Sequence, residues 1–218
     1  MDLNTDELIK FLDNQPQYKN ELAVYYESMK KLPSYDYSNF YSVYPEYADI
    51  ITQGDAIGNL KIISLPDTEI SNARAMIFSN TCDIDLANQR KFPTRLIYAP
   101  IIKLSAYKDM LEEANEDDVK IFTKEQVNGH IADIRAQGIS QIFYLPESKN
   151  LEEESIVFFD RINSADNESI SREALSTERI FSLSSYGWYV FLARLSHFFN
   201  KLSDETVQLR FKPGIPSQ

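Results

Sequence analysis

Five short apolar runs, rich in Ile, Phe and Tyr, occupy the middle of this chain and constrain its fold more than any other feature. Turn residues separate most of them: Gly54-Asp55, Pro66-Asp67 and Pro146. Apolar runs of this length between turn residues predict β-strands with one or both faces buried. The expected strands are residues 56–63, 75–79, 95–102, 141–145 and 155–159.

Helical periodicity flanks and interrupts these strands. Residues 1–32 predict two helices separated by Pro16, and residues 105–138 predict a helical insertion between the third and fourth strands. In the insertion, Ser105 is expected to cap a first helix. Thr123 and Gln126 form a capping box that opens a second helix, which Gly138 ends. Residues 185–202 carry the strongest amphipathic pattern in the chain.

The expected organisation is one α+β domain with an appendage. An N-terminal helical and Tyr-rich arm covers residues 1–50, the β-domain covers 51–212, and 213–218 form a tail. Residues 206–211 alternate and predict a last strand. The Tyr-rich part of the arm is expected to pack on its own domain. Stacking on bases or docking a partner are the alternatives.

Composition narrows the function classes. The chain has 33 acidic and 22 basic residues, a net charge of −11, which opposes non-specific nucleic-acid binding. A single Cys excludes an internal disulfide and favours a reducing compartment. The N-terminus lacks the pattern of a signal peptide, and no apolar run is long enough to span a membrane. We expect a cytoplasmic protein with no membrane partner.

The polar segment SNTCDID, residues 79–85, follows an apolar strand, where functional loops are often mounted. Cys82 is the one thiol of the chain, so a Cys nucleophile would need His130 or His197 as its base. A buried structural Cys is the commoner interpretation. A further alternative is a magnesium site on Asp83 and Asp85, with Asp160 or Asp55. Loop carboxylates more often satisfy backbone donors, so no metal or cofactor is expected.

The order of several short motifs resembles a known family. QGDAI (53–57) opens a strand, NARAMIFSNT (72–81) supplies an Arg, an apolar strand and a Ser, and TRLIYAPII (94–102) follows. SIVFFDRI (155–162) leads into an Asp, and residues 170–199 lead into the last helix. This succession resembles the PemK/MazF-like toxins, which are small, mostly antiparallel SH3-like β-barrels. The resemblance covers about residues 51–202 without the insertion at 103–140.

The resemblance implies a metal-independent endoribonuclease of a toxin–antitoxin or defence system. In that family the RNA 2′-hydroxyl attacks the phosphate while protein groups transfer protons and stabilise charge. A guanidinium can hold the phosphate through two hydrogen bonds, and a carboxylate can accept a proton. The matching residues are Arg74, Asp160 and Ser79 as catalytic groups, with Asn80, Thr81 and Asp83 as substrate contacts.

The alternative function is a catalytically inactive barrel that acts as a protein-binding module. The net charge favours it, and so do departures from the family pattern. Ala75 follows Arg74 where the family has Pro, and Arg161 follows Asp160 where Gln is usual. The expected partner is therefore a protein or single-stranded RNA, with a homodimer as a further option. The sequence leaves open whether the chain is an enzyme.

Overall fold

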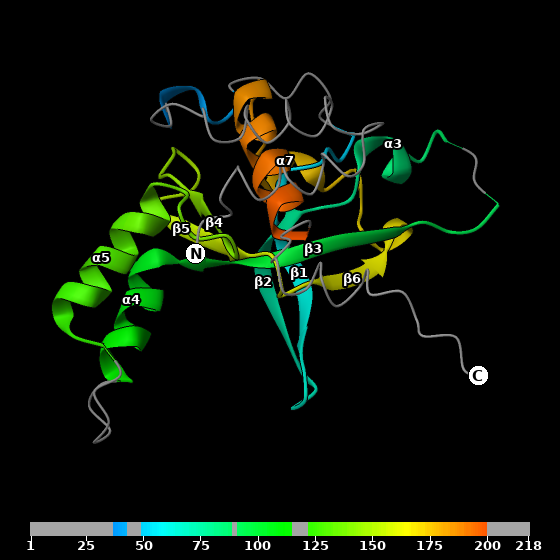
Figure 1. The fold of residues 1–218 in the computed structure, drawn as a ribbon. Helices are drawn as coiled ribbons and strands as arrows, with labels where there is room; N and C mark the ends of the chain where they lie inside the picture. The colour runs from blue at the N-terminus through cyan, green and yellow to red at the C-terminus, as the bar shows by residue number, and fades with distance from the viewer. Residues whose placement is uncertain (1–36, 43–48, 89–90, 115–121, 200–218) are drawn as a thin grey trace, which may run out of the picture. The chain divides into compact units, whose positions relative to one another are not determined.

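The computed structural model describes residues 37–42, 49–88, 91–114 and 122–199 (Figure 1). The chain divides into two compact units, residues 36–195 and residues 1–35 with 196–218. The helices predicted in 1–32, the strand predicted at 206–211 and the tail 213–218 lie outside the described residues. The unit 36–195 holds the described sheet and is the one described below.

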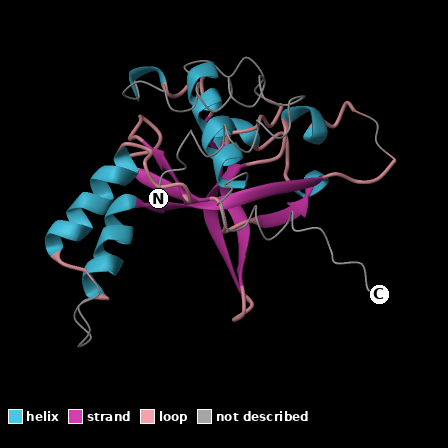
Figure 2. Cartoon of the chain, viewed as in Figure 1, coloured by secondary structure: helices cyan, strands magenta, loops and turns pink. Residues whose placement is uncertain are grey.

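The described residues form an α+β fold, as predicted, and every pair of strands is antiparallel (Figure 2). The strands are β1 (Ala56–Ser64), β2 (Glu69–Ile77), β3 (Arg95–Lys103), β4 (Ile142–Leu145), β5 (Ser155–Phe158), β6 (Asn163–Asp166) and β7 (Arg179–Phe181). The helices are α3 (Thr81–Ile84), α4 (Leu104–Glu113), α5 (Lys124–Arg135), α6 (Leu175–Glu178) and α7 (Ser185–Phe199), with short 3₁₀ turns at Tyr37–Asn39 and Asn167–Ser169. None of these helices is long and apolar enough to cross a membrane.

Strands β1 to β5 confirm the five predicted strands, with boundaries that differ by a few residues. The largest difference is in β2, which begins at Glu69 because its first part is an exposed hairpin arm without an apolar run. β6 and β7 were not predicted. Asn163–Asp166 has no apolar alternation, and Arg179–Phe181 is only three residues long. Their strand conformation follows from pairing with β3 and β1, which a local pattern does not reveal.

The sheet does not close into the predicted barrel. Its strand order is β4-β5-β3-β2-β1-β7, and β6 pairs with β3 beside this path. Two strands share one edge of β3: its first residues pair with β6, and its last residues pair with β5. No ladder joins the two end strands β4 and β7 within the described part of the chain. The prediction of a closed barrel is therefore corrected to an open antiparallel sheet.

Side chains bridge part of the opening between β1 and the β3–β6 pair. The Tyr98 hydroxyl donates to the Lys61 carbonyl at 2.6 Å, and the Ile63 amide donates to the Asn163 side-chain oxygen at 2.8 Å. Burial raises the pKa of the Tyr98 hydroxyl, and Arg95 opposes this shift. Beyond the two residues that pair with β7, the outer edge of β1 is thus bonded by side chains, at Lys61 and Ile63, instead of by another strand.

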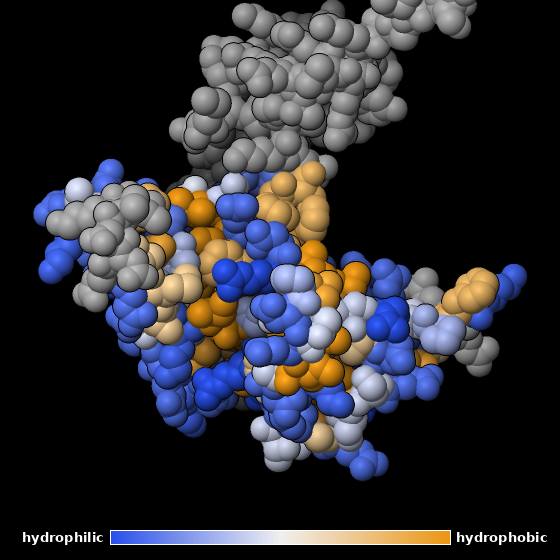
Figure 3. Space-filling model, turned by 90° about the horizontal axis from the view of Figure 1, so that it is seen from below, coloured by the Kyte–Doolittle hydropathy of each residue, from blue (hydrophilic) through white to orange (hydrophobic). Residues whose placement is uncertain are grey.

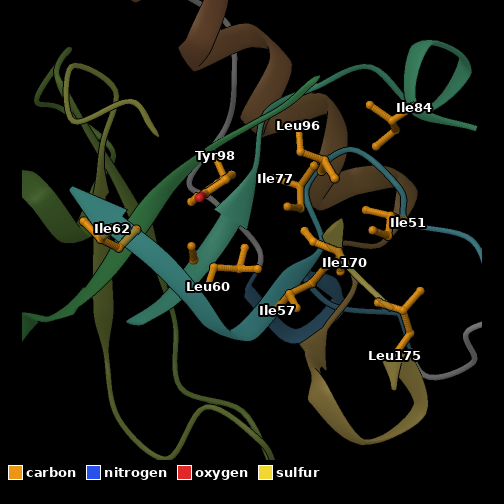
Figure 4. Packing of buried hydrophobic residues seen from close by; sticks show 11 residues of the cluster. Ile51, Ile57, Leu60, Ile62, Ile77, Ile84, Leu96, Tyr98, Ile170 and Leu175 are labelled. Atoms are coloured by element: carbon orange, nitrogen blue, oxygen red, sulfur yellow. The ribbon is translucent and has the colours of Figure 1, made fainter. Parts of the chain in front are cut away.

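A core of branched aliphatic side chains lies inside this curved part of the sheet (Figure 4). β1, β2 and β3 contribute side chains that point toward one another, and Ile170 and Leu175 cover them from the segment after β6. The bend that encloses the core coincides with a change of register in β1 between Ile57 and Leu60, where Asn59 has a φ of 60°.

The helical insertion builds a second core against β4 and β5. The buried face of α5 carries Val127, Ile131 and Ile134, as its periodicity predicts. The capping box of Thr123 and Gln126 is confirmed, whereas α4 begins at Leu104 without the predicted Ser105 cap. The α5 helix ends at Arg135, and Gln137 rather than Gly138 takes the left-handed conformation, with a φ of 54°.

Gln137 also explains how β4 is held. Its side-chain amide is buried, donates to the Tyr144 carbonyl at 2.8 Å and accepts from the Tyr144 amide at 3.1 Å. The side chain therefore makes the same pair of bonds to β4 that a neighbouring strand would make. The contact between the end of α5 and β4 therefore depends on the glutamine side chain at position 137, which hydrophobic periodicity does not predict.

The described part of the Tyr-rich arm packs against its own unit. Phe40 is fully buried, and Tyr41 forms an isolated bridge with Leu183. The Tyr41 hydroxyl donates to the Pro146 carbonyl at 2.7 Å, and the Tyr37 hydroxyl donates to the Arg135 carbonyl at 2.6 Å. The arm thereby links β7 to the end of β4.

A pair of glycine substitutions tests this packing. A Cβ atom at Gly187 of α7 would lie 2.2 Å from the Phe40 carbonyl oxygen, whereas one at Gly129 of α5 would meet no atom within 4 Å. We expect Gly187→Ala to lower the free energy of unfolding by about 2–3 kcal/mol through this clash. Gly129→Ala should raise it by about 0.5–1 kcal/mol through helix propensity. Urea unfolding followed by circular dichroism measures both, and a Gly187→Ala variant as stable as wild type would contradict the packing of the arm.

Candidate functional site

The turn Gln53-Gly54-Asp55 joins the start of β1 to the end of β2. The Gly54 amide donates to the Ile77 carbonyl at 2.9 Å, and the Ile77 amide donates to the Asp55 carbonyl at 2.8 Å. Gly54 has a φ of +90°, and a Cβ atom there would lie 2.7 Å from Leu183 Cδ1. Glycine is therefore required for both conformation and space.

Asp55 has a structural role in this turn. The carboxylate is fully buried and accepts from the Thr52 amide at 2.8 Å and the Thr52 hydroxyl at 2.7 Å. It also forms an ion pair with Arg179 Nε at 3.3 Å, and the guanidinium of Arg179 bonds the Ile50 carbonyl. The Gly-Asp motif thus ties β1 to β7 through a buried charge pair.

Ser79, expected to be catalytic, extends the pairing of β2 and β3. Its hydroxyl accepts from the Ile97 amide at 2.7 Å and lies 3.3 Å from the Arg95 carbonyl, to which it donates. The side chain is buried, and backbone groups occupy its hydroxyl on both sides. This environment gives Ser79 a positioning role at the point where β2 leads into α3.

The remaining residues of the polar loop form and anchor α3. The Asn80 side chain accepts from the Cys82 amide at 2.9 Å and caps the helix. The Thr81 hydroxyl accepts from the Gln53 amide at 3.0 Å, and Asp83 lies exposed on α3. Gln53 continues the network, because its side chain donates to the Phe78 carbonyl at 2.8 Å and accepts from the Trp188 indole at 3.2 Å. The loop is therefore held between the Gly54 turn and α7.

Two hollows adjoin the end of α3 and share Asp85 and Leu86 in their walls. The larger has a volume of about 420 Å³ and the smaller about 290 Å³. We call the larger one the α3 hollow. Its lining is Asp85, Leu86, Asn88, Phe92, Pro93, Thr94, Asp166, Asn167 and Glu168.

The α3 hollow combines apolar and acidic groups. Leu86 and Phe92 are 52% and 81% exposed. Three carboxylates line it, of which Asp166 is paired with Arg95 at 2.5 Å. At its floor, the buried Asn167 amide donates to the Ile84 carbonyl at 2.8 Å and to the Thr94 hydroxyl at 3.1 Å. The lining residues include three acidic and no basic side chains, so a ligand in this hollow would meet carboxylates beside exposed apolar side chains.

Arg172 supplies the positive charge of the smaller hollow. Its guanidinium donates to the Ile170 carbonyl at 2.9 Å and to the Asn167 carbonyl at 3.2 Å. Burial lowers the pKa of Arg172, and the negative charge of Asp85 partly offsets this shift. The guanidinium also donates to the Asn167 side-chain oxygen, so Arg172 holds together the segment that follows β6.

Arg74 and Asp160, the other two expected catalytic residues, lie elsewhere. Arg74 is exposed on β2, five positions before Ser79, which is roughly 16 Å along an extended strand. Hydrogen bonds from Lys103 and Ser105 lower the pKa of Glu153, and the charge of Arg74 adds to them. Asp160 is exposed in the turn after β5. No hydrogen bond or ion pair joins Arg74, Ser79 and Asp160 among the described residues.

The Cys and metal alternatives gain no geometric support. Cys82 is exposed on α3, and His130 is bonded to the Tyr107 hydroxyl at 3.1 Å on the α4–α5 insertion. His197 belongs to the other unit of the chain. Within the described ranges, His, Cys, Asp and Glu side chains do not gather in groups of three or more that could hold a metal ion.

Sequence reasoning placed the polar loop correctly at a strand end but missed the hollow beside it. Asp85 is the last residue of the SNTCDID segment, so a local sequence pattern pointed to it. No local pattern pointed to Asp166, Asn167 or Glu168, because these residues line the hollow only through the pairing of β6 with β3, which was not predicted.

No protein-family model and no curated protein matches this chain. The likeness to PemK/MazF-like toxins therefore stays a prediction from short motifs.

The role of Asp55 is open to direct measurement. Asp55→Asn removes one charge of the buried pair and leaves the Arg179 guanidinium uncompensated. We expect the free energy of unfolding to fall by about 3–5 kcal/mol. Asp67→Asn, at an exposed turn, is the matched control and should change it by less than about 0.5 kcal/mol. Equal effects of the two substitutions on chemical unfolding would show that the turn does not depend on the ion pair.

Proposed function

We propose that this chain is a non-catalytic protein-binding module on a PemK/MazF-like scaffold, and that its partner docks in the α3 hollow. The likeness in fold is supported by the antiparallel order β1-β2-β3 and by the Gly-Asp turn that opens β1. The side-chain bridges from Tyr98 and Asn163 to β1 add to it, because they enclose a core as a small barrel would.

The observation that carries the binding proposal is the composition of the α3 hollow. Soluble proteins seldom expose large apolar side chains together beside a cavity unless another molecule covers them. Here Leu86 and Phe92 flank a cavity of about 420 Å³ whose ionised groups include three carboxylates. This combination fits a polypeptide segment that carries a Lys or Arg close to an apolar residue.

The endoribonuclease implied by the resemblance has less support. The hydroxyl of Ser79 is bonded to the backbone of β3, and Arg74 lies five residues earlier, on the exposed part of β2. The net charge of −11 and the acidic wall of the α3 hollow would both repel an RNA phosphate. Cleavage of RNA stays a prediction of the sequence.

Two substitutions in the hollow test the proposal. Asp85→Asn removes a charge but keeps the side-chain oxygen that accepts from the Ala87 amide at 2.9 Å. Phe92→Ala removes an exposed ring without opening the core. The probe is an array of short peptides that place Lys or Arg near Leu or Phe, with Glu in place of the basic residue in the paired peptides.

We expect the full chain to select basic–apolar peptides and each substitution to weaken binding of the selected peptide at least about tenfold. Leu65→Ala is the matched control, because Leu65 is 79% exposed but lies on the β1–β2 hairpin. Fluorescence anisotropy measures the affinities. Failure to select any peptide, or equal affinities for all three variants, would refute the α3 hollow as the binding site.

A further inference from the structure

We propose that the smaller hollow beside α3 is an apolar subsite of the same groove, and that it takes an apolar side chain of the partner segment whose basic residue enters the α3 hollow. This inference rests on the proposed function and adds a second specificity site to it. The smaller hollow has a volume of about 290 Å³. This volume is close to the lower limit for small-ligand pockets, about 300 Å³, so the hollow suits one side chain better than a longer segment.

The walls of the two hollows differ in chemistry. Five of the eight residues that line the smaller hollow are apolar, against three of the nine that line the α3 hollow. The five are Ile50, Ile51, Ile84, Leu86 and Ala87. An apolar side chain that enters the smaller hollow would therefore lose contact with water on several sides, which favours binding.

The floor of the smaller hollow belongs to the main core. Ile51 and Ile84 are 1% and 2% exposed, and both are members of the core cluster inside the curved part of the sheet. Figure 4 shows them at one side of that cluster, Ile51 on the segment before β1 and Ile84 on α3. Residues that are packed into the core keep their positions without a ligand, and a preorganised wall lowers the cost of binding.

Charged side chains of the smaller hollow offset one another in part. Asp49 and Asp85 line it together with Arg172, so it has two acidic side chains and one basic. The negative charge of Asp85 raises the pKa of Arg172, against the effect of burial, which places the two groups close together. The α3 hollow has three acidic side chains and none basic. A basic residue of the partner is therefore expected in the α3 hollow.

Glu168 is the carboxylate that such a basic residue would meet there. Asp166 is already paired with Arg95 at 2.5 Å. Glu168 is exposed and makes no ion pair within the described part of the chain. An ion pair with the partner would add attraction without first breaking an existing one.

One wall of the α3 hollow suits the apolar stem of a Lys or Arg. The segment between α3 and β3 contributes Phe92, which is 81% exposed, and Pro93. This segment projects at the right of Figures 1 and 3, and Figure 3 shows hydrophobic and hydrophilic surface side by side on the projection. Lys and Arg pack their methylene groups on apolar surface while the charged end reaches a polar group. Phe92 would contact the stem, and Glu168 the charge.

The shared wall sets the spacing of the two side chains of the partner. Asp85 and Leu86 line both hollows, so the two hollows are neighbours. A segment that crosses this wall places one side chain on each side of it. In an extended chain, residues i and i+2 point to the same side about 7 Å apart. We therefore expect a basic and an apolar residue separated by one residue.

Three peptides are the probes for this arrangement. The parent is the peptide that the full chain selects from the array of basic–apolar peptides, extended to separations of one to four positions. The first derivative has norleucine in place of the basic residue, which removes the charge and keeps an apolar stem. The second has Ala in place of the apolar residue. Fluorescence anisotropy with the full chain should show that each derivative binds at least about tenfold more weakly than the parent.

Ile50→Ala and Glu168→Gln assign the two side chains to the two hollows. Ile50→Ala should weaken the parent peptide at least about fivefold and leave the affinity for the Ala derivative unchanged, because that derivative has no apolar side chain in the hollow. Glu168→Gln should weaken the parent and leave the affinity for the norleucine derivative unchanged. Ile63→Ala is the matched control, because Ile63 is 50% exposed but lies on the β1–β2 hairpin.

Ala87→Trp tests the smaller hollow without removing a side chain from its wall. Ala87 is exposed, so the indole can fill the hollow without entering the core. It too should weaken the parent and leave the Ala derivative unchanged. If Ile50→Ala and Ala87→Trp both weaken the two peptides equally, or weaken neither, the apolar subsite is refuted.

The proposed function has a separate outcome in the same experiment. It stands without the apolar subsite if Asp85→Asn and Phe92→Ala weaken the parent peptide while Ile50→Ala and Ala87→Trp do not. If no peptide is selected, or if the selected peptide is indifferent to Asp85→Asn and Phe92→Ala, the proposed function is refuted and the apolar subsite with it.

Discussion

The buried contact between Asp55 and Arg179 is the interaction on which the rest of the sheet depends. It fixes the turn before β1, and that turn bonds the end of β2 through Ile77. Burial of two charges costs desolvation energy, so removal of one partner costs more stability than the intact pair contributes. From this point the neighbouring Gln53 reaches the α3 loop and α7, and the position of the candidate site follows from the turn.

Polar side chains complete the sheet where backbone ladders end. The Gln137 amide imitates a strand beside β4, the Ser79 hydroxyl prolongs the pairing of β2 with β3, and Asn163 caps the edge of β1. Each bond satisfies a backbone group that would otherwise be unpaired.

Much of the fold could be predicted from local patterns. Apolar runs predict buried strands such as Ile142–Leu145, and the spacing of apolar residues predicts the buried face of α5. The capping box at Thr123 follows from residues that are close in sequence. β6 and the opening of the sheet could not be predicted in this way. Asn163–Asp166 is polar, and whether a sheet closes depends on long-range geometry that no window of sequence contains.

The candidate site was predictable only in part for the same reason. The motif SNTCDID marked a polar loop at a strand end, which is where it lies. The sequence could not show that Ser79 and Asp55 serve the backbone, because a hydroxyl or carboxylate looks the same whether it binds a substrate or a neighbouring strand. Nor could it show that Asp166 and Phe92 share a wall of the α3 hollow.

We propose that this scaffold binds a protein partner and does not cleave RNA. Incubation of a mixed pool of single-stranded RNA with the full chain in EDTA tests it most directly, with Arg74→Ala and Asp160→Ala as comparison variants. Our account predicts that wild type cuts no more RNA than either variant, at high protein concentration and at several pH values. Metal-independent cleavage that both substitutions abolish would contradict it and would support the toxin-like mechanism.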